Sequence, residues 1–320
     1  MEIVKWSALF IISLAVLIKS ADYFTTTAEK IGLHFKIPSF IIGVTIVALG
    51  TSLPEIATSV ISVSEGQSQI VIGNVVGSNL ANILLVLAIT AIIGKRLFVS
   101  KDIINIDLPI LLGSTILLFI TTLDGKFSYA DAAISLLTLL TYILYNTKAH
   151  REIEPKEKRE LSKLKAEEKK EKLKIKYPII LIVSGIFLYF SADFTIESVI
   201  QLSNIFKVGT EIIAVSAIAI GTSLPELAVS AVAAKKGKAD IAIGNVTGSN
   251  IFNILGVMGI PALFGTLHIP PGMITFTIPV LIFVTILYVF VTMDKQITKW
   301  EGLTLLLLYI AFLGKTFGLI

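Results

Sequence analysis

The sequence contains no cysteine and only three histidines, His34, His150 and His268. The absence of cysteine excludes disulfides, thiolate sites and cysteine-based zinc sites, and the scattered histidines argue against a histidine-ligated metal enzyme. Charge is also scarce: 16% of the 320 residues are charged, whereas soluble domains contain about 25%. These absences exclude an ordinary soluble domain, a disordered chain and a secreted disulfide scaffold.

Hydrophobic residues make up 54% of the chain and fall into long stretches. A transmembrane helix needs about 20 mainly apolar residues, so we predict an all-α polytopic membrane protein with ten transmembrane helices. The first stretch is too long for a signal peptide and has no small-residue cleavage site, so it is interpreted as a membrane helix. The predicted helices are 3–31, 38–63, 70–93, 103–123, 127–147, 177–203, 210–234, 240–264, 273–293 and 299–319.

The charges are concentrated in one segment. Residues 148–176 hold 12 Lys or Arg and 7 Asp or Glu, which predicts a solvated linker between a first half, 1–147, and a second half, 177–320. With the N-terminus outside, 21 basic residues fall in inner loops and 4 in outer segments. The positive-inside rule therefore places both termini outside and the linker in the cytoplasm, in the cell membrane.

The two halves contain an internal repeat. Residues 20–94 align without a gap on 191–265, with 33 identities over 75 positions. Because five predicted helices separate the copies, the second copy is turned over in the membrane. We therefore predict two inverted five-helix repeats, an architecture whose substrate site lies at the repeat interface near the bilayer midplane.

Each repeat places one glutamate inside a predicted helix, Glu55 or Glu226, and these are the two acids that we expect deep in the membrane. An ionisable group at that depth costs at least about 2.5–3.5 kcal/mol and indicates function by default. Pro54 and Pro225 precede the glutamates, and a proline interrupts helical hydrogen bonding. The sequence predicts that each helix kinks or breaks there; after a break, a new half-helix would carry the glutamate in its first turn, where the dipole favours a carboxylate.

Hydroxyls and amides surround the glutamates at helical spacings. Thr51 and Ser52 share a helical face with Glu55, and Ser78 is one turn before Asn82. The second repeat has Thr222, Ser223, Ser249 and Asn253 at the same positions. Oxygen-only donors suit hard cations such as Ca²⁺, Na⁺ and Mg²⁺.

Other repeated residues keep two interpretations open. Gly73, Gly77, Gly244 and Gly248 allow either close helix packing or a functional bend. The matched aspartates Asp22 and Asp193 either make a structural hydrogen bond, which we favour, or line an ion path.

The paired motifs GTSLPE and GNxxGSNxxN resemble the two α-repeats of the sodium/calcium exchanger family, of prokaryotic type, within the cation/Ca²⁺ antiporter superfamily. The resemblance covers 40–94 and 211–265. It implies electrogenic exchange of about three Na⁺ for one Ca²⁺ by alternating access, with the first and sixth helices sliding across the others. The two ions bind as substrates at four clustered sites. The residues implied at these sites are Glu55, Glu226, Thr51, Ser52, Thr222, Ser223, Ser78, Ser249, Asn82 and Asn253, with backbone oxygens of Ala48, Thr51, Ala219 and Thr222.

Alternatives use the same glutamates. Asn253 resembles the potassium-independent type, because potassium-dependent relatives carry Asp there, and Ca²⁺/H⁺ exchangers lack Ser-Leu-Pro before the glutamate; K⁺ or H⁺ coupling is therefore the alternative. A passive channel conflicts with a closed midplane site, and an intramembrane enzyme lacks a metal-binding or nucleophile motif. We expect a transporter that is no enzyme, needs no cofactor, binds no nucleic acid and functions as a monomer in the lipid bilayer.

Overall fold

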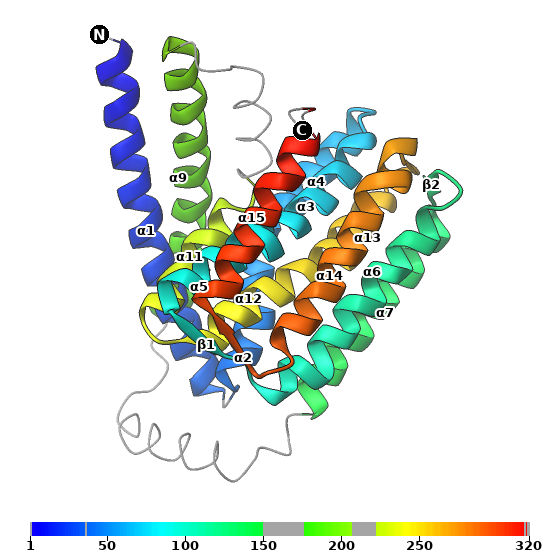
Figure 1. Cartoon of the computed structure of the whole chain (residues 1–320), viewed down its shortest axis with the longest axis horizontal. Coiled ribbons are helices and arrows are strands. Elements are labelled where there is room, and N and C mark those ends of the chain that lie inside the picture. Colours follow the sequence, from blue (N-terminus) through cyan, green and yellow to red (C-terminus); the bar gives the residue numbers. More distant parts are fainter. Residues whose placement is uncertain (1, 36, 150–175, 207–221, 317, 319–320) are drawn as a thin grey trace.

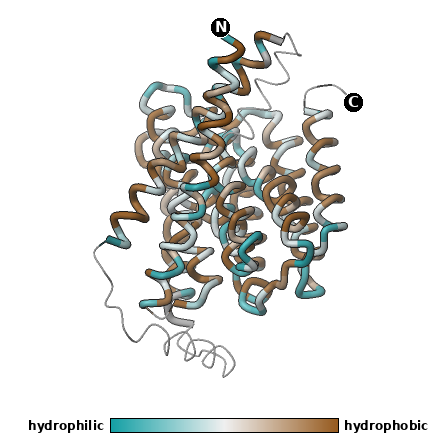
Figure 2. Tube along the Cα trace, turned by 90° about the vertical axis from the view of Figure 1, so that its left-hand side faces the viewer, coloured by the Kyte–Doolittle hydropathy of each residue, from teal (hydrophilic) through white to brown (hydrophobic). Residues whose placement is uncertain are grey.

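Long helices dominate the structure, a computed structural model that describes residues 2–35, 37–149, 176–206, 222–316 and 318. Seven helical segments of the described residues are long and apolar enough to cross a membrane: Glu2–His34, Ser39–Ser64, Gln69–Gly94, Ile103–Thr122, Lys176–Leu202, Ala239–Ala262 and Met273–Thr292. Hydrophobic residues run along the helices, and hydrophilic residues gather at the turns that join them (Figure 2). The main elements of the chain are thus helices, and their length and apolar composition suit a lipid bilayer.

The first half of the chain supplies five helical segments (Figure 1). Three of them contain a π-helical turn, here called η. They are α1 (Glu2–His34); α2 (Ser39–Ile42), η1 (Gly43–Val47) and α3 (Ala48–Ser64); α4 (Gln69–Ala81), η2 (Asn82–Val86) and α5 (Leu87–Gly94); η3 (Ile103–Asp107) and α6 (Leu108–Thr122); and α7 (Tyr129–Ala149).

The second half supplies the helices α9 (Lys176–Phe206); α11 (Leu224–Lys235); α12 (Ala239–Phe252), η4 (Asn253–Val257) and α13 (Met258–Ala262); η5 (Met273–Thr277) and α14 (Ile278–Thr292); and α15 (Lys299–Thr316). The helices α7, α11 and α15 have 21, 12 and 18 described residues and do not belong to the seven candidate spans. Most of the predicted linker 148–176 and the first part of the predicted helix 210–234 lie outside the described residues.

Four short strands add to the predicted all-α fold. Strand β1 (Arg96–Phe98) pairs antiparallel with β4 (Gln296–Thr298), and β2 (Lys126–Phe127) pairs antiparallel with β3 (Leu267–His268). Leu97 lies opposite Ile297, and Phe127 lies opposite Leu267. Strand β1 follows α5 and strand β3 follows α13, which are matching helices of the two halves. Strands β2 and β4 follow the matching helices α6 and α14. Each sheet therefore joins a turn of the first half to a turn of the second.

The π-helical turns also recur between the halves. The turn η2 starts at Asn82 and η4 starts at Asn253, two positions that the repeat alignment matches. The turns η3 and η5, which start at Ile103 and Met273, likewise precede the matching helices α6 and α14. The sequence offered no signal for these turns, because a π-turn inserts one residue without changing the apolar composition of the helix.

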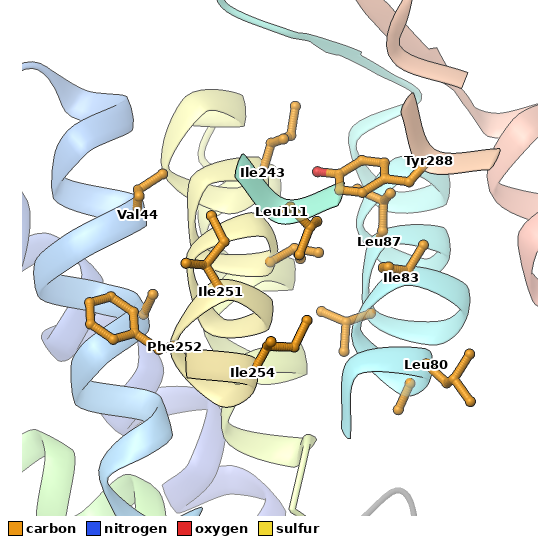
Figure 3. Close-up of a cluster of buried hydrophobic side chains, with 14 of the residues drawn as sticks. Val44, Leu80, Ile83, Leu87, Leu111, Ile243, Ile251, Phe252, Ile254 and Tyr288 are labelled. Carbon is orange, nitrogen blue, oxygen red and sulfur yellow. The ribbon is translucent and has the colours of Figure 1, made fainter. Parts of the chain in front are cut away.

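The helix α12 lies at the centre of the molecule. All of the most apolar window of the segment Ala239–Ala262 is buried, compared with 17% in α1. Figure 3 shows Ile243, Ile251 and Phe252 of this helix between Val44, which belongs to η1, and Leu87 of α5. The central position of α12 brings its polar residues against the helices of the first half.

Glycines permit this close contact. A Cβ at Gly43 would lie 2.6 Å from the Ile241 carbonyl oxygen, and one at Gly244 would lie 2.7 Å from the Phe40 carbonyl oxygen. A Cβ at Gly248 would lie 2.7 Å from that of Ala48. At Gly244 and Gly248 the structure therefore supports the packing interpretation, since any side chain would push the backbones apart.

The helices α1 and α9 pack along one another and stand at the edge of the bundle (Figure 1). The Thr195 hydroxyl of α9 donates to Ser13 Oγ of α1 at 2.9 Å. Only 28% of the apolar window of α9 is buried. This peripheral pair contacts the bundle mainly through α11 and, at fewer positions, through α2, η1 and α3.

Candidate cation site

Glu55 and Glu226 are buried inside the bundle. Their side chains are 2% and 0% exposed, and neither carboxylate has a hydrogen-bond partner among the described residues. The two groups are close enough for their charges to interact. Burying an unpaired carboxylate is costly, so the charges of this pair have to be neutralised, either by protons or by a bound cation.

The two glutamates lie on differently built helices. At Glu226 the predicted helix start is confirmed, because α11 begins at Leu224 with Pro225 in its first turn and the glutamate directly after it. The residues that precede this start, 207–221, lie outside the described part of the chain. At Glu55 one of the two predicted outcomes, a break at Gly50–Leu53, is wrong, since α3 runs unbroken from Ala48 to Ser64 with Pro54 inside it. A proline removes one backbone hydrogen bond but can be accommodated by bending a continuous helix.

Hydroxyl groups from opposite halves meet beside the glutamates. Thr51 Oγ1 lies 3.3 Å from Ser249 Oγ, and Ser78 Oγ lies 2.9 Å from Thr222 Oγ1. Both Thr51 and Ser249 lie beside the Glu226 carboxylate. Each contact joins one GTSLPE segment to the GSN segment of the other half, so the structure brings these four predicted residues together in two equivalent pairs.

The amides of Asn82 and Asn253 lie at the first residue of the turns η2 and η4. Both side chains are fully buried, and none of their four polar atoms has a hydrogen-bond partner in the described part of the chain. π-Turns occur frequently at functional sites because they redirect a side chain within a helix. The buried, unpartnered amides therefore have oxygens available for a cation.

The remaining predicted residues show the same pattern. Ser52 and Ser223 are buried, and neither Oγ has a described partner. The Ala48 carbonyl oxygen accepts a hydrogen bond from Thr51 Oγ1 at 3.2 Å. Ala219 lies outside the described residues.

Sequence reasoning did not single out Asn245, which links three helices at the site. Its amide donates to Ser230 Oγ at 2.9 Å and to the Glu226 carbonyl oxygen at 3.4 Å, and its Oδ1 accepts from Thr51 at 3.4 Å. The repeated GN dipeptide, which also contains Asn74, was the available signal. Asn245 thus positions the helix that carries Glu226.

A third buried acid, Asp107, was also missed. It is fully buried at the end of η3, and its Oδ1 accepts hydrogen bonds from Tyr142 Oη at 2.7 Å and from Asn146 Nδ2 at 3.4 Å. The expectation that Glu55 and Glu226 are the two deeply buried acids is therefore wrong in number. Unlike the carboxylates of Glu55 and Glu226, the carboxylate of Asp107 accepts hydrogen bonds from two side chains of α7, which indicates a structural environment.

The donor set of the site consists of oxygen and amide groups. No group of three or more His, Cys, Asp or Glu side chains gathers among the described residues, so the charge of the site comes from two carboxylates. Neutral hydroxyl, amide and carbonyl oxygens complete it. This chemistry fits hard cations such as Na⁺ and Ca²⁺ and does not suit soft metals.

Comparison with known proteins identifies the family of the chain. The profile of a family described as "Sodium/calcium exchanger protein" matches residues 5–148 and 176–317. The chain belongs to the sodium/calcium exchanger family. Members of this family exchange cations across membranes, so the chain is a membrane transporter. The substrates that the family transports are Na⁺ and Ca²⁺.

Relatives match this exchanger over nearly its whole length. The sodium/calcium exchanger MaX1 of Methanosarcina acetivorans is 31% identical over 95% of this chain and 96% of its own. The inner membrane protein YrbG of Escherichia coli is 31% identical over 94% of this chain and 93% of its own. A solved structure of the sodium-calcium exchanger NCX_Mj, soaked with Na⁺ and Sr²⁺, has a TM-score of 0.80 at 30% identity and covers 97% of this chain and 98% of that one.

Proposed function

We propose that this protein exchanges Na⁺ for Ca²⁺ across the cell membrane and that both ions bind between Glu55 and Glu226. The observation that carries the proposal is the burial of two carboxylates without a described hydrogen-bond partner. The name of MaX1 and the Na⁺-containing and Sr²⁺-containing NCX_Mj structure add support.

The proposed site uses the charge of the glutamates first. One Ca²⁺ neutralises two carboxylates, whereas three Na⁺ leave one positive charge. Exchange of three Na⁺ for one Ca²⁺ is therefore electrogenic, and each charge moved is worth about 2.3 kcal/mol per 100 mV. The neutral ligands proposed are Thr51, Ser52, Thr222, Ser223, Ser78, Ser249, Asn82 and Asn253, with the backbone oxygens of Ala48, Thr51, Ala219 and Thr222.

Competition for the glutamates couples the two fluxes. Both ions need Glu55 and Glu226, so they cannot occupy the full site together. An empty pair of carboxylates resists enclosure because their charges repel in a low dielectric. Only a loaded site changes access, which prevents leak.

The architecture proposed is ten transmembrane helices in two inverted repeats, with domain limits 1–147 and 177–320 and the linker 148–176 between them. The equivalent strand pairings and the matched positions of η2 and η4 support this symmetry. We assign α1 and α9 as the sliding pair, because they pack on one another at the edge of the bundle.

The orientation proposed puts both termini outside and the linker inside, and it rests on the 21 to 4 distribution of basic residues. The strand pairs agree with it, since β1 and β4 belong to turns assigned inside and β2 and β3 belong to turns assigned outside. We propose that the monomer is the functional unit and that no cofactor is required.

Ion-gradient experiments test the proposal. Purified protein in proteoliposomes should accumulate radiolabelled Ca²⁺ when the vesicles are loaded with Na⁺ and diluted into Na⁺-free medium. A valinomycin-set potential should change the initial rate, because the exchange carries net charge. Uptake driven by a pH gradient alone would establish the Ca²⁺/H⁺ alternative, and a strict K⁺ requirement would establish the potassium-dependent one.

A further inference from the structure

A cavity of about 220 Å³ lies next to Glu55. One wall is made by Glu55 and Thr222 together with the two prolines, and the other wall is made by α9. The α9 residues are Tyr189, Ala192, Asp193 and Ile196, whose spacing of three, one and three places them on one helical face. The cavity therefore connects the buried, unpartnered carboxylate of Glu55 to one face of the peripheral helix.

Asp193 is the acidic residue on that face of α9. Its side chain is exposed, and it forms no ion pair among the described residues. The cavity walls around it are mainly apolar, with Ala192, Ile196 and the two prolines. A charge set in low-dielectric walls attracts counter-ions strongly, because the field is focused into the opening.

The equivalent position in the first half, Asp22, has a different environment. Asp22 forms an ion pair with Lys236, and the Lys236 ammonium also donates to Thr26 Oγ1 at 2.8 Å. Further along α1, Glu29 forms an ion pair with Lys238. Asp22, which corresponds to Asp193, is therefore already paired with an ammonium group. This ion pair lies where α1 meets the turn before α12.

The positions that correspond to the two lysines carry no positive charge in the other repeat. The gap-free repeat alignment places Glu65 opposite Lys236 and Gln67 opposite Lys238, and neither Glu65 nor Gln67 is cationic. The repeat symmetry of the site is thus broken at its entrances: one aspartate is paired with a lysine, and the other faces a cavity. Electrostatics makes the two faces of the protein unequal.

We propose that Asp193 is the entrance residue that draws Ca²⁺ and Na⁺ into the cavity beside Glu55, whereas Lys236 excludes them from the equivalent Asp22. The inference rests on the proposed function, because it assigns the access path to that same site. Under the proposed orientation the Asp193 entrance faces outside. The cation passes from an exposed carboxylate to a buried one and loses its water in the cavity between them.

Variants of two carboxylates on α9 test the role of Asp193. Asp193→Asn removes the charge of the entrance, and Glu197→Gln removes an exposed charge one turn further along that does not line the cavity. Initial rates of Na⁺-driven uptake of radiolabelled Ca²⁺ are measured against external Ca²⁺ in proteoliposomes. A focusing cleft raises association by about 10-fold to 1,000-fold, so Asp193→Asn should raise KM for Ca²⁺ by about tenfold with little change in the maximal rate.

Three further results follow from an electrostatic role. Reconstituted molecules face both ways, so only the population with the Asp193 face outside should shift, giving two components in the uptake curve. The shift should shrink as choline chloride raises the ionic strength, and Asp193→Glu should restore the wild-type KM. Glu197→Gln should behave as wild type.

An unchanged KM for Asp193→Asn, or an equal shift for Glu197→Gln, would overturn the inference, since the charge would then act as ordinary surface charge. Loss of the maximal rate without a KM shift would overturn it as well. Failure of the wild type to take up Ca²⁺ on a Na⁺ gradient would instead reject the proposed function.

Discussion

Ser78 Oγ lies 2.9 Å from Thr222 Oγ1, which joins α4 to the residues preceding α11. The equivalent contact exchanges the halves, with Thr51 Oγ1 at 3.3 Å from Ser249 Oγ. Thr51 and Ser249 lie beside the Glu226 carboxylate, and Thr222 lines the same cavity as Glu55. Each hydroxyl pair therefore joins the two repeats at the site that we propose for the cations.

Removing a hydroxyl from these pairs should weaken cation binding. We expect Ser78→Ala to raise the dissociation constant for Ca²⁺ by about tenfold, which corresponds to about 1.4 kcal/mol, because a neutral ligand is lost while the charge remains. Isothermal titration of the purified protein measures this. Ser62→Ala removes an exposed hydroxyl outside the site and should leave affinity unchanged. Equal affinities for Ser78→Ala and wild type would exclude the hydroxyl from the site.

The close packing of α12 on the first half makes a prediction about stability. Gly248→Ala would place a Cβ 2.7 Å from that of Ala48, and overpacking of this kind costs about 1–3 kcal/mol. The melting temperature in detergent should fall. At Gly113 an added Cβ meets nothing within 4 Å, so Gly113→Ala should melt no lower than wild type. A Gly248→Ala protein as stable as Gly113→Ala would show that the contact tolerates a side chain.

Variants at and around the buried Asp107 test whether this acid has a structural role or takes part in transport. Tyr142 Oη donates to its carboxyl group at 2.7 Å, and leaving a buried polar group without its hydrogen bond costs about 1–3 kcal/mol. Tyr142→Phe should therefore lower the melting temperature, whereas Tyr145→Phe, at an exposed neighbouring position, should not. Asp107→Asn should keep Na⁺-driven Ca²⁺ uptake; its complete loss in a folded protein would place Asp107 in the transport path.

Features that depend on composition and on the internal repeat could be predicted from the sequence. Apolar length predicted a helical membrane protein, and the repeat singled out Glu55 and Glu226, which are both buried. Helical spacing correctly placed Thr51 and Ser52 with Glu55 inside the bundle. These features follow from local periodicity, which is visible in one segment at a time.

Other features depend on contacts between distant segments and left no local signal. The proline rule predicted a kink or a break at Gly50–Leu53, and the sequence could not decide between them; in the structure α3 is continuous through Pro54. The strand pairs form because two distant turns meet, and the bridging role of Asn245 requires knowing that α12 lies against α3 and α11. The structural interpretation of Asp107 likewise depends on its hydrogen bond from Tyr142, which lies on another helix.

The central claim is that Glu55 and Glu226 hold the exchanged ions, and Na⁺-driven uptake of radiolabelled Ca²⁺ by glutamine variants tests it most directly. Glutamine keeps the shape of glutamate and removes an unpaired buried charge, so Glu55→Gln and Glu226→Gln should fold with a melting temperature no lower than wild type. Their uptake should equal that of empty liposomes, whereas Glu65→Gln, at the exposed end of α3, should transport as wild type. Wild-type uptake by either Glu55→Gln or Glu226→Gln would contradict the assignment.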